Sequence, residues 1–267
     1  MEFLHERARA AAERALADES ARRRHLVVAL SGAHAYGFPS PDSDLDLKAV
    51  HVEPTRHLLG LREPKQAFDR MEIIGGVEID YTSNEIAPVL AGILAGNGNY
   101  IERILGHLVC VSSPAHEALK PLVRRALSRR VHRHYRGFAS SQRQAFEAAE
   151  APTAKKLLYV LRTTLTGAHL LRTGELRIDL TTVAHEYDFG HALELVETKR
   201  RGEQVTLSTA ERARWQGDLD RAFELLDQAH ASSVLPPEPT NADELEDWLV
   251  ALRLGAGLGR DAGLAGQ

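Results

Sequence analysis

One short segment, Asp44 to Val52, restricts the fold more than any other part of the chain. It reads Asp-Leu-Asp-Leu-Lys-Ala-Val-His-Val, and charged and apolar side chains alternate strictly at its start. A period of two predicts a β-strand with one polar and one apolar face. The strand therefore needs an apolar layer on one side, while Asp44 and Asp46 share the other side.

Three further runs are β-prone, and the rest of the chain is mostly helical. The runs are 26–30, 67–74 and 77–82, and Gly75-Gly76 between the last two predicts a hairpin. A helix is expected over 2–22, and the pattern turns helical from Asn84 onward. We therefore expect an α+β fold with a small β-sheet domain (1–112), an all-helical domain (113–254) and a flexible tail (255–267).

The composition narrows the class of protein. The 267 residues suffice for one or two domains at about 150 residues each. Hydrophobic residues make up 43% and charged residues 26%, as in ordinary globular proteins, and the net charge of −4 offers no overall basic field for duplex nucleic acid. A single cysteine, Cys110, excludes intrachain disulfides and Cys-cluster metal sites. Without an apolar signal core or a long apolar run, a cytoplasmic protein with no membrane partner is expected.

The two aspartates of the alternating strand are candidate metal ligands. Like charges side by side are unfavourable unless a cation lies between them, and oxygen ligands favour a hard ion such as Mg²⁺. Glu78 and Asp80 share one face of the hairpin by the same alternation, so either could add a third carboxylate. The alternative is that these acidic residues only line solvated strands.

A small-residue turn lies directly upstream of the aspartates. Ser31-Gly32-Ala33-His34 follows the β-prone run 26–30, and small residues at such a turn let backbone N–H groups approach a phosphate closely. A phosphate-binding turn and a carboxylate pair about a dozen residues apart are more specific together than either alone. The combination therefore counts against the alternative that these acidic residues only line solvated strands.

Two linked motifs carry a family resemblance. Gly32-Ala33, followed after a short spacer by Ser43-Asp44-Leu45-Asp46, resembles the Gly-Ser or Gly-Gly turn and Asp-x-Asp signature of the DNA polymerase β-type nucleotidyltransferase superfamily. Segments 30–37 and 40–44 more closely resemble the bacterial and phage nucleotidyltransferases associated with RNA-repair operons. Segments 96–102, 155–162 and 235–239 also resemble that family, so the resemblance covers roughly residues 26–253.

The resemblance implies a mixed sheet that carries three catalytic carboxylates, two Mg²⁺ ions (Mn²⁺ being the alternative) and a nucleoside triphosphate, with a helical lobe closing over them. It assigns the carboxylates to Asp44, Asp46 and Asp80, with Glu78 as the alternative third ligand. The nucleotide contacts it implies are Ser31, Gly32, Ala33, His34, Ser43, Lys155, Tyr159 and Arg162. Ala33 departs from the family pattern, because a serine there would offer a hydroxyl to a phosphate oxygen.

A basic helix is the candidate cover of the site. Lys155, Tyr159 and Arg162 share one helical face, and we expect this face to lie across a cleft from Asp44 and Asp46 and to contact phosphate. The alternative is an ordinary solvated face. Asn97 and Asn99 are expected to cap a helix that begins near Tyr100, while Glu102 is either a buried ion-pair partner or a catalytic residue.

These residues favour a metal-dependent nucleotidyltransferase, which transfers a nucleoside monophosphate from a triphosphate to an acceptor hydroxyl and releases pyrophosphate. The acceptor could be an RNA end, a protein side chain or a small molecule, and the sequence sets neither the acceptor, the preferred nucleotide nor the oligomeric state. The alternative is a catalytically weakened module that binds nucleotides or RNA ends, which the alanine at position 33 would fit.

Overall fold

The computed structural model describes residues 1–202 and 204–255. Its strands are β1 (Arg24–Leu30), β2 (Leu45–Val52), β3 (Ala67–Ile74), β4 (Val77–Glu85) and β5 (Val109–Ser112). Its helices are α1 (Glu6–Ser20), α2 (Gly32–Ala35), α3 (Thr55–Leu58), α4 (Ile86–Leu94), α5 (Gly98–Leu105), α6 (Pro114–Arg125), α7 (Val131–Ala148), α8 (Ala154–Thr173), α9 (Leu180–Glu186), the short 3₁₀ helix η1 (Gly190–Ala192), α10 (Leu193–Arg200), α11 (Thr209–Arg214), α12 (Gln216–Ala231) and α13 (Ala242–Leu254).

The strands form one mixed sheet in the order β3-β4-β2-β1-β5. β2 and β4 run parallel, and the other neighbouring pairs are antiparallel. The β3–β4 hairpin turns at Gly75 and Gly76, both with positive φ, which glycine adopts without steric penalty. The expected α+β fold with a small mixed sheet, the alternating strand and the glycine hairpin are confirmed.

Two expectations about the strands are wrong. The helical pattern does not start at Asn84, because β4 continues through Glu85. The expectation also missed β5, which pairs with the free edge of β1. Four residues are too few for a period of two to stand out, so this strand depends on its tertiary partner.

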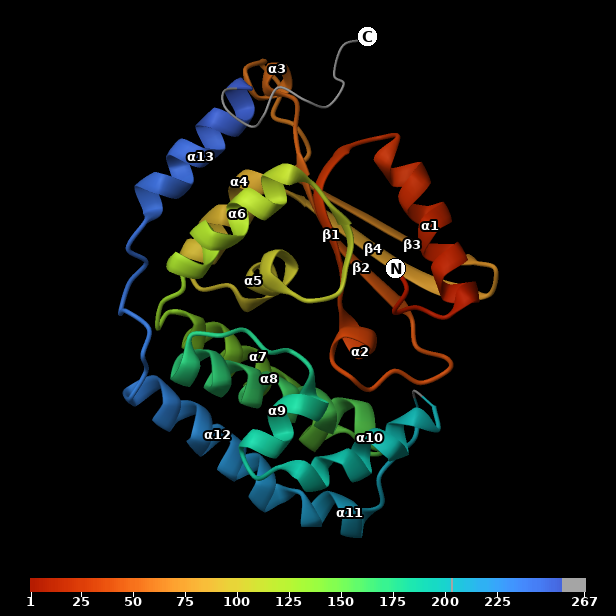
Figure 1. Cartoon of the computed structure of the whole chain (residues 1–267). Helices are drawn as coiled ribbons and strands as arrows, with labels where there is room; N and C mark the ends of the chain where they lie inside the picture. Colours follow the sequence, from red (N-terminus) through yellow and green to blue (C-terminus); the bar gives the residue numbers. More distant parts are fainter. Residues whose placement is uncertain (203, 256–267) are drawn as a thin grey trace.

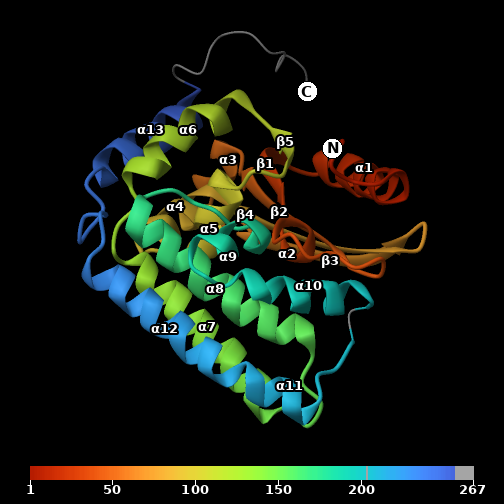
Figure 2. The same cartoon turned by 60° about the horizontal axis from the view of Figure 1, so that its bottom comes forward.

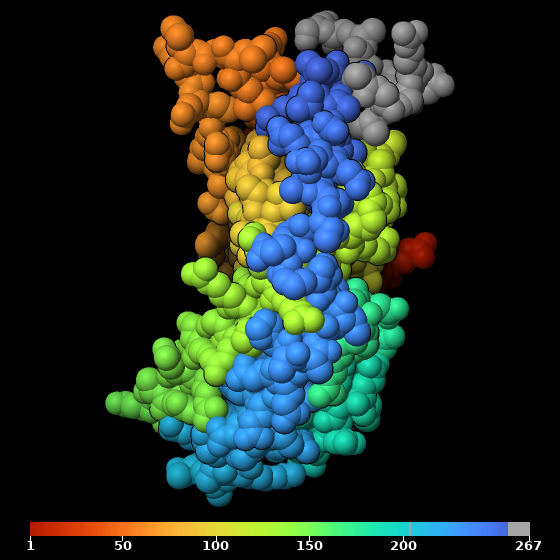
Figure 3. Space-filling view, turned by 90° about the vertical axis from the view of Figure 1, so that its left-hand side faces the viewer, coloured from red at the N-terminus to blue at the C-terminus, as the bar shows by residue number. Residues whose placement is uncertain are grey.

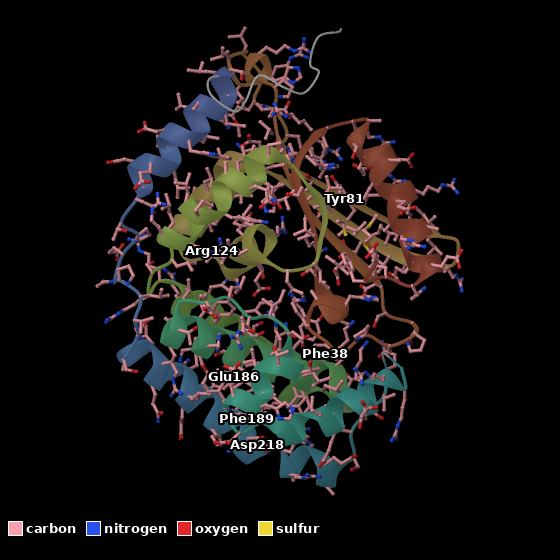
Figure 4. The ribbon with its side chains drawn as sticks, viewed as in Figure 1. Phe38, Tyr81, Arg124, Glu186, Phe189 and Asp218 are labelled. Carbon is pink, nitrogen blue, oxygen red and sulfur yellow. The ribbon has the colours of Figure 1, made fainter. Side chains whose placement is uncertain are left out.

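Helix α1 covers one face of the sheet. Leu30, Leu47, Ile79 and Tyr81 point to this face and are buried against apolar residues of the helix. Figure 4 shows Tyr81 on the side of the sheet that α1 occupies. The apolar half of the alternating strand therefore has the single apolar layer that its sequence requires.

The remaining helices pack at one end of the sheet and along its other face. Figure 1 shows α7–α12 gathered at the end where α2 lies, and Figure 2 shows α10 beside α2. Phe38, from the loop after α2, is fully buried in the core that α8, α9 and α12 share, at the junction visible in Figure 4. The α2 turn and the loop after it are thus packed into the core of the helical part.

The packing does not follow the expected boundary at residue 112. α6 and α13, both within the expected helical domain, pack with α4 in one core that also contains Val27 and Val50 of the sheet. In Figure 3, α12 and α13 form one continuous ridge along the side of the molecule. The division into 1–112 and 113–254 stays a prediction.

Among the helices of residues 1–202 and 204–255, none is long and apolar enough to cross a membrane. The expected flexible tail, 255–267, lies outside the described residues except for Gly255, which ends α13 in a left-handed conformation.

Candidate active site

Two carboxylates on neighbouring strands converge on one cation. Asp46 of β2 lies directly beside Asp80 of β4 in the parallel register. The ammonium of Lys48, two residues further along β2, lies 3.3 Å from Asp46 Oδ1 and 2.8 Å from Asp80 Oδ2. All three side chains point away from α1, so the sheet face opposite α1 carries the charged cluster.

The electrostatics of this cluster are unfavourable for a bare carboxylate. Burial, together with the negative charge of Asp44, raises the pKa of Asp46 to about 6, although Lys48 acts in the opposite direction. A further positive charge near Asp46 would stabilise its ionised carboxylate. The cluster therefore favours binding of a cation.

The four acidic residues expected at the site differ in position. Asp44 directly precedes β2 and is close enough for its charge to act on Asp46. Asp80 is the register partner of Asp46, whereas Glu78 lies exposed two residues earlier on β4, opposite Ile73. Asp80 is thus the better-placed third carboxylate, and the assignment itself stays a prediction.

The donor set fits a hard divalent ion. Mg²⁺ in proteins is often held by one or two carboxylates together with substrate phosphates and water. Asp46 and Asp80 supply two converging oxygens, and the ammonium of Lys48 already stands where they meet. Within the described part of the chain, no three Asp, Glu, His or Cys side chains converge closely enough to hold an ion by themselves.

The small-residue turn lies directly against the carboxylates. Gly32, with a φ of 62°, is in the left-handed region, and a Cβ at this position would overlap the Asp46 carboxylate. Ser31 N donates to the Asp46 carbonyl at 2.9 Å, which holds the turn on β2. Glycine is therefore required here both by its backbone conformation and by the close approach of Asp46.

A cavity of about 200 Å³ opens between this turn, the sheet, α5 and α8. Its lining includes residues of the turn, the sheet and both helices: Ser31, Gly32, Tyr36, Asp46, Lys48, Asn99, Glu102, Arg103 and Tyr159. Burial and the nearby negative charges of Asp46 and Asp44 raise the pKa of Tyr159, so its hydroxyl stays protonated. The cavity is smaller than the roughly 300–1,000 Å³ typical of ligand sites, so it matches part of a nucleotide.

Five of the eight expected nucleotide contacts do not line this cavity, and three of the five come from α2 and the loop that follows it. The Ala33 side chain is buried in the helical core, so a hydroxyl there would face apolar atoms and not a phosphate. Ser43 Oγ accepts from Ser40 N at 3.0 Å within its own loop. Ser43 and His34 line a second, larger pocket on the other side of α2.

The basic helix reaches the site with only one of its three expected residues. Tyr159 lines the cavity, whereas Lys155 is partly buried on the first turn of α8 and lies outside the lining. Arg162 is 3% exposed, forms an ion pair with Glu102, and stacks on the Tyr36 ring at 3.6 Å. The expectation that Arg162 faces phosphate is corrected, because its guanidinium is buried and pairs with Glu102.

Arg162 belongs to a buried network that links the turn to three helices. Tyr36 OH lies 3.1 Å from Ser31 Oγ, and Tyr135 OH donates to Glu102 Oε1 at 3.1 Å. Glu102 is thus the buried ion-pair partner that the sequence offered as one of two roles. Asn97 caps α5 by accepting from Asn99 N at 3.0 Å, as expected.

Two lysines at the site were not singled out by their sequence. Lys48 continues the alternation of Asp44 and Asp46, and that spacing could have indicated it. Lys199 of α10 is fully buried, and its Nζ donates to Ser40 Oγ at 2.7 Å and to Ser43 Oγ at 2.6 Å. No local pattern could identify Lys199, because its partners lie more than 150 residues away in the chain.

The mixed sheet, with α2 at one end and helices after it, is consistent with a nucleotidyltransferase-like α+β fold. The chain belongs to the RNA repair pathway DNA polymerase beta family, whose model matches residues 6–251.

Proteins similar to this chain include one known from its sequence and one of solved structure. An uncharacterized protein of Methanocaldococcus jannaschii, MJ0002, is 29% identical over 159 residues, which cover 59% of this chain and 64% of that protein. The chain thus spans less than two thirds of its curated relative. A nucleotidyltransferase-like protein from Exiguobacterium sibiricum is 11% identical, with a TM-score of 0.33 over 84% of this chain and 74% of that one.

Proposed function

We propose that this protein is a metal-dependent nucleotidyltransferase that transfers a nucleoside monophosphate from a triphosphate to an acceptor hydroxyl. The observation that carries the proposal is the convergence of Asp46 and Asp80 on one cation beside the Ser31–Gly32 turn. Such a reaction needs no protein nucleophile, because it depends on positioning and charge neutralisation.

Asp46 and Asp80 would hold Mg²⁺ or Mn²⁺, with Asp44 adding negative charge. The bound metal would neutralise the triphosphate and lower the pKa of the acceptor hydroxyl. Lys48 places a positive charge between the carboxylates, Ser31 and Gly32 of the turn line the cavity, and Tyr159 keeps a protonated donor in its wall. We propose that the protein acts in the cytoplasm, as expected from its sequence.

A second candidate is a weakened module that binds nucleotides or RNA ends without turnover. The observations in its favour are the small volume of the cavity and the ammonium of Lys48 between the carboxylates. Release of pyrophosphate separates the two functions, since only the enzyme forms it.

The test is an incubation of the full chain with each of the four labelled ribonucleoside triphosphates and Mg²⁺ or Mn²⁺. RNA, protein and small-molecule acceptors are added separately, and label transfer and pyrophosphate are measured. We expect metal-dependent transfer that Asp46→Asn lowers strongly and that Asp247→Asn, which changes an exposed carboxylate on α13, leaves intact. Nucleotide binding without pyrophosphate in every combination would favour the weakened module.

A further inference from the structure

The ammonium of Lys48 is the counter-ion of the two converging carboxylates. It contacts both Asp46 and Asp80, and within residues 1–202 and 204–255 neither carboxylate forms an ion pair with another group. The side chains of Lys48 and Asp46 are each 17% exposed, so water screens their charges only in part. A metal ion that enters between the carboxylates therefore has to displace this ammonium.

The contact between Lys48 and Asp80 is made by the lysine side chain and not by the pairing of the strands. In the parallel register, Asp46 lies beside Asp80, whereas Lys48 lies beside Thr82. The Lys48 side chain therefore leans back along β2 to reach Asp80. Because a lysine stem is flexible, its ammonium can leave the carboxylates by side-chain rotation while the strands stay in place.

The cavity beside the carboxylates offers the displaced ammonium a new position. Lys48 already lines this cavity, together with Ser31 and Gly32 of the turn and Arg103 of α5. Arg103 is half-buried, and its guanidinium donates to Asn84 Oδ1. In the described part of the chain no carboxylate forms an ion pair with Arg103. An anion that enters the cavity therefore meets a guanidinium that no carboxylate neutralises.

Replacement of the ammonium by a divalent ion changes the charge that the cavity offers to a phosphate. Without metal, one ammonium faces two carboxylates, so one negative charge remains, and the nearby charge of Asp44 adds to it. This charge opposes a phosphate group. A divalent ion between the carboxylates neutralises both of them, and the ammonium of Lys48 then joins Arg103 as a partner for a polyanion.

We propose that Lys48 is an exchangeable counter-ion: it neutralises Asp46 and Asp80 in the absence of metal, and it moves to the triphosphate when a divalent ion takes its place. The inference rests on the proposed function, because it concerns the metal and the triphosphate of that reaction. One ammonium cannot serve the carboxylates and the phosphates at once. Binding of the metal and binding of the triphosphate therefore strengthen each other by way of Lys48.

The first test measures binding of Mn²⁺ to the full chain without nucleotide, from the electron paramagnetic resonance signal of the free ion. Lys48→Met should bind Mn²⁺ about tenfold more tightly than the wild type, because the ion no longer displaces a hydrogen-bonded ammonium. The control is Lys120→Met, which also takes an ammonium from a carboxylate, that of Glu117 on α6, and should bind Mn²⁺ like the wild type.

The second test measures triphosphate binding to the same proteins at saturating Mn²⁺. The probes are the α,β-methylene analogues of the four ribonucleoside triphosphates, and the analogue that the wild type binds most tightly is used for the comparison. Lys48→Met should bind it about tenfold more weakly, since a hydrogen bond from a charged donor is lost. Lys120→Met should bind it like the wild type.

A third measurement follows Lys48 in the wild-type chain, where the fold is not altered. The chain has six lysines, so a sample with ¹⁵N-labelled lysine gives few ammonium signals. The signal of Lys48 is assigned by its absence from Lys48→Arg, which keeps the positive charge. We expect this signal to shift when Mg²⁺ is added and to shift again when the analogue is added.

Opposite changes in the two affinities of Lys48→Met support the exchange. Tighter Mn²⁺ binding with unchanged triphosphate binding would overturn it, because Lys48 would then only block the metal. Unchanged Mn²⁺ binding with weaker triphosphate binding would also overturn it, because Lys48 would then serve the phosphates alone. The same holds if the wild type binds neither probe, or if the Lys48 ammonium signal does not move at saturating Mg²⁺ and analogue.

The exchange and the proposed function fail in different measurements. If the two affinities change in opposite directions but no triphosphate yields pyrophosphate in the acceptor screen, the exchange stands and the enzyme activity does not. If pyrophosphate is released but Lys48→Met binds both probes like the wild type, the proposed function stands and the exchange is overturned.

Discussion

The two faces of the β2–β4 region use the same strands for opposite purposes. On the α1 face, Leu47 and Tyr81 are buried in a closed apolar core. On the other face, the alternate residues Asp46, Lys48 and Asp80 form a charged cluster, and burial raises the pKa of Asp46. The comparison shows that one face supplies stability, whereas the other holds carboxylates whose unfavourable burial Lys48 offsets only in part.

The largest expected effect is on the charged face. Asp46→Asn keeps the shape but removes the charge that meets the cation, so pyrophosphate release should fall by a factor on the order of 10²–10³. Thermal melting of the metal-free protein should stay the same or rise, because burial disfavours the wild-type carboxylate. A variant that melts well below the wild type would show that Asp46 serves the fold, which contradicts the contrast between the faces.

Leu47→Ala probes the closed face at the next position of the same strand. Leu47 is fully buried against α1, so truncation should lower the free energy of unfolding by about 2–5 kcal/mol. Denaturant titration measures this loss. At temperatures below its unfolding transition, the variant should keep its metal-dependent activity. A loss of activity in the fully folded variant would mean that the two faces are coupled.

Lys199→Met tests how the helical part supports the charged face. Removal of the ammonium takes a donor from both Ser40 and Ser43, at a loss of about 1–3 kcal/mol for buried polar groups left without partners. For a chain of this size each kcal/mol lowers the melting temperature by about 2–4 °C. The control is Lys120→Met, which changes a lysine paired with Glu117 and should melt like the wild type. If both variants melt at the same temperature, Lys199 does not stabilise the loop before Asp44.

Ala33→Ser separates the two sides of the α2 turn. From the sequence alone, the added hydroxyl would be expected to tighten triphosphate binding. Because Ala33 is buried in the helical core, we now expect a loss of stability of about 1–3 kcal/mol and no gain in nucleotide affinity. Equilibrium nucleotide titration beside denaturant unfolding checks both parts, and tighter binding would place the side chain at a phosphate after all.

The smallest effect concerns pH on the α1 side. Burial, then the charge of Arg23, lowers the pKa of His25 from 6.5 to about 4, and its Nε2 lies 2.7 Å from Tyr81 OH. The unfolded chain therefore binds a proton that the folded chain does not, so stability present above pH 6.5 is lost as the pH falls towards 4. Unfolding at pH 7 and pH 5 should show a smaller difference in His25→Gln than in the wild type; identical differences would exclude His25 as a contributor.

Local patterns were sufficient for strands β1 to β4 and for the candidate carboxylates. The period of two in Asp44–Val52 determined which side chains face together, and the register then placed Asp80 beside Asp46. β5 was missed because four residues carry no clear period, and it forms only where β1 offers an edge.

The sequence by itself determined the family, the alternating strand and the glycine turn, because each of these depends on residues close together in the chain. Tertiary structure alone decided which charges remain available to a substrate. Arg162 resembles a phosphate contact by spacing, yet Glu102, sixty residues away, pairs with it inside the core. The residues around Lys199 form no recognisable motif, yet Lys199 donates hydrogen bonds to Ser40 and Ser43 in the loop before Asp44. The physical reason is that a buried charge needs a partner, and its partner is chosen by packing between distant segments, which no local spacing encodes.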